Sequence, residues 1–166
     1  MSYYLEIWLE GSVKDYFRKV STKNENPYHP HITLVRPFEI KTSEKNIKNK
    51  IINLCKGKPL ISFNLEGKGN FDNKIHYIPL TDCTNLLRFN YDLEKLLEND
   101  VEFDEKINDE KILHATVNSE KEIDFCPKIR QTMSKLTVIR NKKIWFSYDF
   151  VDQKILNREE SLGKSN

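Results

Sequence analysis

The sequence predicts an α+β domain built from two similar halves. Segments with the period-2 alternation of half-buried strands are interspersed with segments that have the 3.6-residue period of amphipathic helices. The order is roughly βαβαββ followed by αβαββ, so strand–helix–strand units occur in both halves. Each half also contains one strand with the pattern His-x-Thr. Together these observations indicate a pseudo-duplicated architecture with two lobes.

Composition sets limits on the class of protein. The 166 residues, 38% of them hydrophobic, suffice for one domain with a substantial core. The 27 basic and 25 acidic residues give a net charge of +2, too small for a protein that coats nucleic acid through charge alone. Three widely spaced cysteines argue against a secreted disulfide framework. No apolar run approaches the ~20 residues of a membrane span, and the N-terminus lacks the basic start of a signal peptide. We expect a cytoplasmic protein.

The first half is predicted to alternate strands and helices. The expected order is strand 3–9, helix 12–20, strand 31–35, helix 43–55, strand 60–67 and strand 74–80. Ser43 can cap the second of these helices. Pro37 is expected to end the strand over 31–35, because proline cannot donate a ladder hydrogen bond. The segment FDNK before the last strand predicts a hairpin.

The second half repeats the alternation. The expected order is helix 84–98, loop 99–111, strand 112–117, helix 124–135, strand 136–140 and strand 143–151. Pro127 would be tolerated in the first turn of the helix over 124–135. Asn141-Lys142 is typical of a two-residue hairpin loop. We expect residues 1–166 to form a single domain of two intertwined lobes, with about 153–166 as a loosely ordered C-terminal tail.

The two His-x-Thr motifs are the main candidates for an active site. They are His31-Ile32-Thr33 in PHITLV and His114-Ala115-Thr116 in ILHATV. Side chains at i and i+2 of a strand point to the same face. If the two strands lie side by side, one surface therefore carries two imidazoles and two hydroxyls. The alternative is that these are two unrelated strand histidines, each satisfied by its own neighbours.

Such a set of groups suits hydrolysis of a phosphate ester. One neutral imidazole can take a proton from water, while the other, protonated, donates a proton to a leaving alkoxide. The two hydroxyls can hydrogen-bond the non-bridging phosphate oxygens and fix the in-line geometry. This chemistry needs no metal, and we expect no metal and no cofactor.

PHITLV paired with a distant LHATV resembles the two-histidine (2H) phosphoesterases, whose signature is two His-x-Thr/Ser motifs on strands. The resemblance is to the RNA 2′,3′-cyclic phosphodiesterase branch, historically called 2′-5′ RNA ligases, and it extends over most of the chain to the final hairpin LTVIRNKKIWFSYDF. It implies a bilobal fold with two antiparallel sheets facing a central groove, helices outside and the motifs at the groove floor. It also implies cyclic phosphate hydrolysis, with His31 and His114 as the acid–base pair and Thr33 and Thr116 as phosphate holders.

One feature departs from that branch. Its members often carry an arginine a few residues after the second motif, whereas here Val117-Asn118-Ser119 follows without one. Arg36 occupies the comparable place after the first motif and is the candidate for a substrate-binding charge. Strand alternation from His31 puts position 36 on the opposite face, unless Pro37 bends the chain.

The substrate implied by the resemblance is an RNA end or a small cyclic nucleotide, usually opened to the 2′-phosphate as in RNA processing. No membrane partner is expected, and we expect a monomer. Two alternatives remain: a phosphodiesterase acting on 2′-5′ oligonucleotides or other cyclic nucleotides, and a non-catalytic module that binds nucleotides or RNA.

Further residues could complete the site. His29 is expected at the groove rim, where it could orient His31. Tyr28 and Phe38 flank the first motif and could stack on a base, although packing is equally plausible for each. Segment 128–143 holds six basic residues and no acidic one, so it could line an RNA backbone path or be a solvated strand edge.

Overall fold

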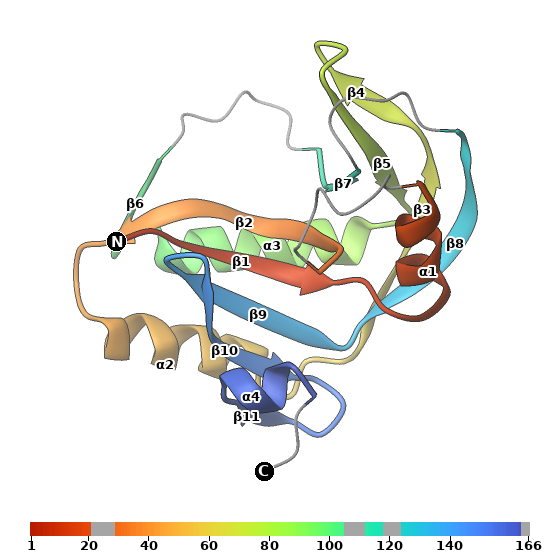
Figure 1. Ribbon diagram of the computed structural model, residues 1–166. Coiled ribbons are helices and arrows are strands. Elements are labelled where there is room, and N and C mark those ends of the chain that lie inside the picture. Colours follow the sequence, from red (N-terminus) through yellow and green to blue (C-terminus); the bar gives the residue numbers. More distant parts are fainter. Residues whose placement is uncertain (21–28, 105–111, 118–123, 164–166) are drawn as a thin grey trace.

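Eleven strands and four helices make up the part of the chain described by a computed structural model, residues 1–20, 29–104, 112–117 and 124–163 (Figure 1). The strands are β1 (Tyr3–Trp8), β2 (His31–Ile40), β3 (Ile61–Gly67), β4 (Gly69–Phe71), β5 (Ile75–Thr81), β6 (Val101–Phe103), β7 (His114–Thr116), β8 (Cys126–Met133), β9 (Lys135–Arg140), β10 (Lys143–Asp149) and β11 (Lys154–Leu156). The helices are α1 (Gly11–Val20), α2 (Glu44–Cys55), α3 (Thr84–Leu97) and α4 (Arg158–Ser161).

Antiparallel pairing links all of these strands. Nine of them follow in the order β11-β10-β9-β1-β2-β7-β5-β3-β8, with β4 added to β5 and β6 added to β2. The predicted α+β class, with a mostly antiparallel sheet, is confirmed. The expected two sheets are joined here into one strand order, which puts the strands of the two motifs, β2 and β7, at its centre. The duplicated two-lobed arrangement stays a prediction.

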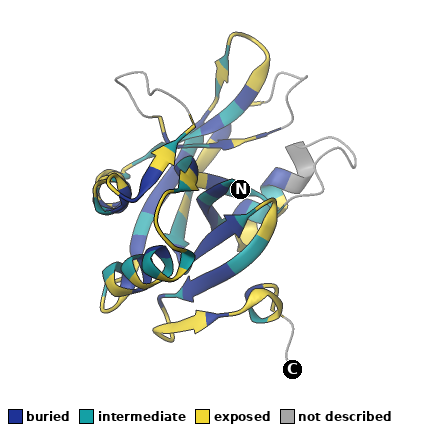
Figure 2. Cartoon of the chain, turned by 90° about the vertical axis from the view of Figure 1, so that its left-hand side faces the viewer, coloured by how far each residue is buried: buried dark blue, intermediate teal, exposed yellow. Residues whose placement is uncertain are grey.

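The core lies on one face of the central strands. Leu5 and Ile7 of β1 and Ile32 of β2 are fully buried. Helix α3 contacts β2, β3 and α2, and it lies behind β1 and β2 in Figure 1. Figure 2 shows burial concentrated in the central strands, whereas the β4–β5 tip and the C-terminal segment are exposed. The opposite face of β1, β2 and β7 is therefore not covered by this core.

Strand β2 does not end at Pro37, contrary to the sequence prediction, and two irregularities explain how it continues. Its register against β1 shifts between the pairs Glu6–Thr33 and Leu5–Val35, which makes Leu34 the extra residue of a bulge. Asn90 of α3 donates to the Leu34 carbonyl at 2.6 Å. A second shift, before Phe38, leaves Pro37 where the β1–β2 ladder needs no N–H donor.

Several local predictions are confirmed. The Ser43 hydroxyl accepts from the Asn46 amide at 3.2 Å and caps α2. Asn141 and Lys142 have φ angles of 48° and 64° and form the two-residue turn between β9 and β10. The FDNK segment turns the chain between β4 and β5.

The predicted helix over 124–135 is wrong, because β8 occupies this segment. β8 pairs with β3 from Ile61–Met133 to Gly67–Cys126. It is the last strand in the order, so the missing N–H of Pro127 is tolerated at the edge. The helical pattern in the sequence could not show that β3 offers an unpaired edge at this place.

Two segments expected to be irregular contain strands. Within the predicted loop 99–111, β6 extends the far end of β2 through the pair Phe38–Phe103, while residues 105–111 lie outside the described part. The predicted loose tail instead forms β11, paired with β10, and α4, which Asn157 caps through the Glu160 amide. Residues 164–166 lie outside the described part.

All three cysteines are free thiols, and burial raises the pKa of Cys55 to about 12. Among the helices of the described residues, none has the length and apolar character needed to cross a membrane.

The bulge at Leu34 predicts a stability effect. Replacing Asn90 by alanine removes this hydrogen bond, which should cost about 0.5–1.5 kcal/mol of unfolding free energy. Urea denaturation measures the loss. Tyr91→Ala, at a neighbouring position of α3 that is 64% exposed, is the matched control and should change little. Equal midpoints for Asn90→Ala and the wild type would contradict this role of Asn90.

Candidate active site

The two His-x-Thr motifs lie beside each other. β2 and β7 pair antiparallel through Ile32 and Ala115, and both of these side chains are fully buried. Continuing the register by one residue in each direction places His31 opposite Thr116 and His114 opposite Thr33. The four side chains therefore emerge together on the face away from the core. Both threonines are exposed and both histidines half-buried. The structure thus brings together the four residues predicted from the sequence.

Both imidazoles are held in the same way. The Nδ1 of His31 is 2.9 Å from the His29 carbonyl, and the Nδ1 of His114 is 2.9 Å from the Ile112 carbonyl. In each motif the carbonyl two residues earlier accepts the Nδ1–H, which fixes the tautomer and leaves Nε2 for chemistry. The orienting group before His31 is therefore the backbone of His29 and not its imidazole.

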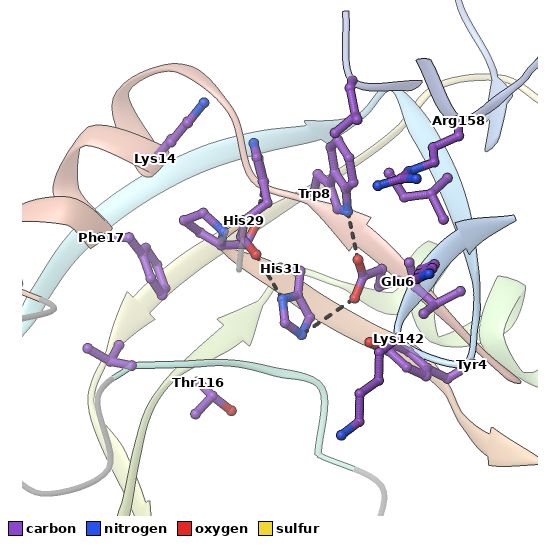
Figure 3. Close-up of a pocket in the computed structure, with 16 residues that line it drawn as sticks. Tyr4, Glu6, Trp8, Lys14, Phe17, His29, His31, Thr116, Lys142 and Arg158 are labelled. Carbon is purple, nitrogen blue, oxygen red and sulfur yellow. Dashed lines mark hydrogen bonds and ion pairs between the residues drawn. The ribbon is translucent and has the colours of Figure 1, made fainter. Parts of the chain in front are cut away.

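A buried carboxylate faces the first histidine. On β1, Glu6 lies opposite Thr33 and Trp8 opposite His31. The Glu6 Oε2 is 3.5 Å from the His31 Nε2, and the Trp8 indole N–H donates to Glu6 Oε1 at 2.7 Å (Figure 3). Burial raises the pKa of Glu6, while a charge on His31 and the indole donor oppose this shift. The contact is favourable only when a proton lies between Glu6 and His31.

Aromatic rings surround the second histidine. Phe71 of β4 meets the His114 ring edge-on at 5.1 Å between centroids, and Tyr77 of β5 lies at 5.0 Å. Phe71 and Tyr77 also stack on each other at 4.5 Å. A Cβ at Gly69 would lie 2.5 Å from the Tyr77 ring, so the glycine is what lets this ring lie against β4. The two motifs therefore share a sequence pattern but have different surroundings.

A cavity of about 620 Å³ opens on the His31 side of the motif pair. Its walls come from β1, α1, the start of β2, the end of β7, the β9–β10 hairpin and α4. His31 and Thr116 line it, together with Glu6 and Trp8 (Figure 3). Thr33 and His114 are not among the lining residues and lie beyond the cavity, on the same sheet face.

Arg36 is placed away from this cavity. β2 is irregular near Pro37, as the sequence allowed, but this does not bring Arg36 to the cavity. The Arg36 guanidinium lies over the Phe103 ring, 4.3 Å from the centroid, and Arg36 does not line the cavity. A substrate contact by Arg36 stays a prediction that this arrangement does not favour.

The other residues predicted near the first motif occupy different environments. His29 stacks on Trp8 at 4.6 Å between centroids and forms part of the cavity wall, and burial lowers its pKa. Phe38 is fully buried in the core, so it offers no surface to a base. Tyr28 lies outside the described residues. In the described part of the chain, no group of three or more His, Cys, Asp or Glu residues could hold a metal ion.

Sequence reasoning missed Glu6 and Trp8 as site residues. A signal for Glu6 existed, because it is the single charged residue in the strand YYLEIW, and its alternation places it on the face opposite Leu5 and Ile7. Nothing in the sequence placed that face beside His31, since this depends on the pairing of β1 with β2.

Solved structures share this fold at low sequence identity. The crystal structure of TT0787 of Thermus thermophilus matches with a TM-score of 0.64 and 12% identity, over 90% of this chain and 98% of that one. A crystal structure of a phosphoesterase matches with a TM-score of 0.56 and 12% identity, over 93% and 92% of the two chains. Neither the protein-family models nor the curated proteins give a match. At this identity the likeness shows the fold alone.

The raised pKa of Glu6 predicts how stability depends on pH. An unfolded glutamate titrates near about pH 4.3, whereas the folded protein holds this proton to higher pH. Stability is therefore lost as pH rises through this interval, because ionising Glu6 in the folded state is unfavourable. The melting temperature of Glu6→Gln minus that of the wild type should therefore rise as pH increases from about pH 4 to pH 8. Thermal melts across this range measure the difference.

Glu102→Gln removes an exposed carboxylate on β6 and is the control. Its difference from the wild type should stay nearly constant over the same range. A Glu6→Gln variant that becomes relatively less stable as pH rises would contradict the assigned cost of burying the charge.

Proposed function

We propose that this protein is a phosphodiesterase of the 2H type that opens a nucleoside or RNA-terminal 2′,3′-cyclic phosphate by His/His acid–base catalysis, without a metal. One observation carries the proposal. Two imidazoles with matching Nδ1 anchors and two exposed hydroxyls emerge on one sheet face from adjacent strands. The fold shared with a phosphoesterase supports it.

The surroundings of the two histidines suggest different roles. The His31 Nε2 lies 3.5 Å from the Oε2 of the buried Glu6, a position from which a carboxylate can stabilise an imidazolium, so His31 is suited to be the general acid. Among the described residues, no carboxylate forms an ion pair with His114, whose Nδ1–H is held by a carbonyl. Its Nε2 is then free to accept a proton, which makes His114 the general base.

In this mechanism His114 Nε2 takes a proton from water while the water oxygen forms a bond to phosphorus. The bond from phosphorus to the ribose 3′-oxygen breaks, and its electron pair stays on that oxygen. His31 Nε2 gives its proton to the departing oxygen, and the product is a 2′-phosphate. Thr33 and Thr116 donate hydrogen bonds to the non-bridging phosphate oxygens and hold phosphorus in line. Proton transfer from His114 to His31 by way of solvent restores the starting state.

Replacing either histidine by alanine should abolish useful turnover. General acid–base catalysis contributes typically ~10²–10⁴-fold per group, so kcat should fall by about this factor in His31→Ala and in His114→Ala. The assay incubates enzyme with 2′,3′-cyclic mononucleotides, cyclic-phosphate-ended RNA and 2′-5′ linked oligonucleotides in the presence of EDTA. Identifying the products also decides between the cyclic substrate and the 2′-5′ diester.

His76→Asn is the histidine control, because His76 of β5 does not line this cavity and takes no part in the proton transfer. Circular dichroism should show that all three variants keep the fold. Full activity in either alanine variant would refute the mechanism. Tight binding of cyclic nucleotide without product over a long incubation would instead identify a nucleotide-binding module.

The Glu6–His31 contact predicts a change in the pH profile. With two catalytic imidazoles, kcat/KM should depend on pH as a bell. The Glu6 Oε2 lies 3.5 Å from the His31 Nε2, so Glu6→Gln removes the charged neighbour of one of the two imidazoles. The bell of Glu6→Gln should therefore differ from that of the wild type in shape as well as in height. A profile that only loses height would reduce Glu6 to a structural role.

A further inference from the structure

The cavity extends beyond the catalytic groups toward a set of cations that hydrolysis of the cyclic phosphate does not use. Four basic side chains line it, here called the basic wall: Lys14 of α1, Lys142 and Lys143 of the β9–β10 hairpin, and Arg158 of α4. Glu6 is the single acidic residue among those lining the cavity, and its carboxylate faces the His31 Nε2 at 3.5 Å. Figure 3 shows Lys14, Lys142 and Arg158 arriving from different elements around Trp8, Glu6 and His31.

The position of Lys142 points to a ligand. Both residues of the β9–β10 turn are in the left-handed region, and glycine is the favoured residue at the second position of such a turn. A lysine there strains the backbone, and among the described residues no acidic side chain forms an ion pair with it. The charge of Lys142 is therefore available to an anion in the cavity that this residue lines.

The cavity connects the first motif to the β9–β10 hairpin. β9 is two steps from β2 in the strand order, about 10 Å across the sheet, and the hairpin meets β1 at Tyr3, whereas His31 meets β1 at Trp8. Aromatic groups fill the interval: Trp8 with its stacked His29, together with Tyr4 and Phe17, also line the cavity. Flat aromatic surfaces of this kind suit a nucleoside.

We propose that the basic wall is a subsite for a second, non-reacting phosphate of the substrate, carried on the 5′-oxygen of the nucleoside whose cyclic phosphate lies at the motifs. The identity of the reacting phosphate rests on the proposed function. A phosphate on the 5′-oxygen occurs in two kinds of substrate. In a nucleotide it is a 5′-phosphomonoester, and in an oligonucleotide it is a diester.

Binding can test the subsite without turnover. Isothermal titration calorimetry compares adenosine 2′-monophosphate with adenosine 2′,5′-bisphosphate, the expected products without and with the additional phosphate. The wild type should bind the bisphosphate at least ~10-fold more tightly, since a charge-assisted contact is typically worth this much or more. A dinucleotide ending in a 2′-phosphate, which carries the same position as a diester, forms the third arm and shows whether the subsite also takes a chain.

The test variant is Lys142→Gly combined with Arg158→Gln. Glycine suits the left-handed turn, so the hairpin should fold at least as well as before. The ratio of the two dissociation constants should fall from about tenfold to near one, and raising the salt concentration should do the same in the wild type. Lys154→Ala removes an exposed lysine of β11 that does not line the cavity, and it should keep the wild-type ratio.

Equal affinity of the wild type for both ligands would overturn the subsite, and so would a ratio that survives in the double variant. Hydrolysis of adenosine 2′,3′-cyclic phosphate, which lacks the 5′-phosphate, is measured in parallel and reports on the proposed function alone. A protein that discriminates the ligands but hydrolyses nothing would therefore fail the proposed function and keep the subsite.

Discussion

The site depends on a very short contact, the pairing of β2 with β7 at Ile32 and Ala115. β7 has only three residues, so it pairs with a small part of the β2 edge. On its other side β7 pairs with β5, where Ala115 lies opposite Ile78. These three apolar side chains are fully buried and fix which face the motif residues occupy. A shift of this register by one residue would turn one motif into the core, because side chains alternate along a strand.

Around this pair, equivalent strands carry different chemistry. β1 flanks β2 and β5 flanks β7, so the position opposite each threonine can be compared across the centre. Glu6 lies opposite Thr33, whereas Tyr77 lies opposite Thr116. Burying a carboxylate is unfavourable unless it is paired and hydrogen-bonded, and Glu6 has both an indole donor and an imidazole. The first motif therefore has a carboxylate at this position, whereas the second motif has a phenol ring, and this is the chemical difference between the two motifs.

Local chemistry made part of this structure predictable. The Ser43 cap, the Asn141-Lys142 turn and the two motif strands follow from residues within a few positions of each other. The errors came from long-range pairing: β8 is a strand because β3 presents an edge, and β2 passes Pro37 because bulges relieve its pairing with β1. His31, Thr33, His114 and Thr116 could be selected from spacing, but Glu6 could not, because its neighbour in the site is 25 residues away along the chain, from position 6 to position 31.

The basic stretch over 128–143 shows why charge in the sequence is a weak guide to charge on the surface. Lys128 and Arg130 lie on β8 at one end of the strand order, whereas Lys142 lies in the hairpin toward the other end. The segment therefore supplies no continuous path for an RNA backbone. What gathers cations is the cavity, which brings α1, the β9–β10 hairpin and α4 together beside His31. Composition assigns the segment that contains α4 to a loose tail. Arg158 reaches the cavity because β11 pairs with β10 and α4 follows β11 directly.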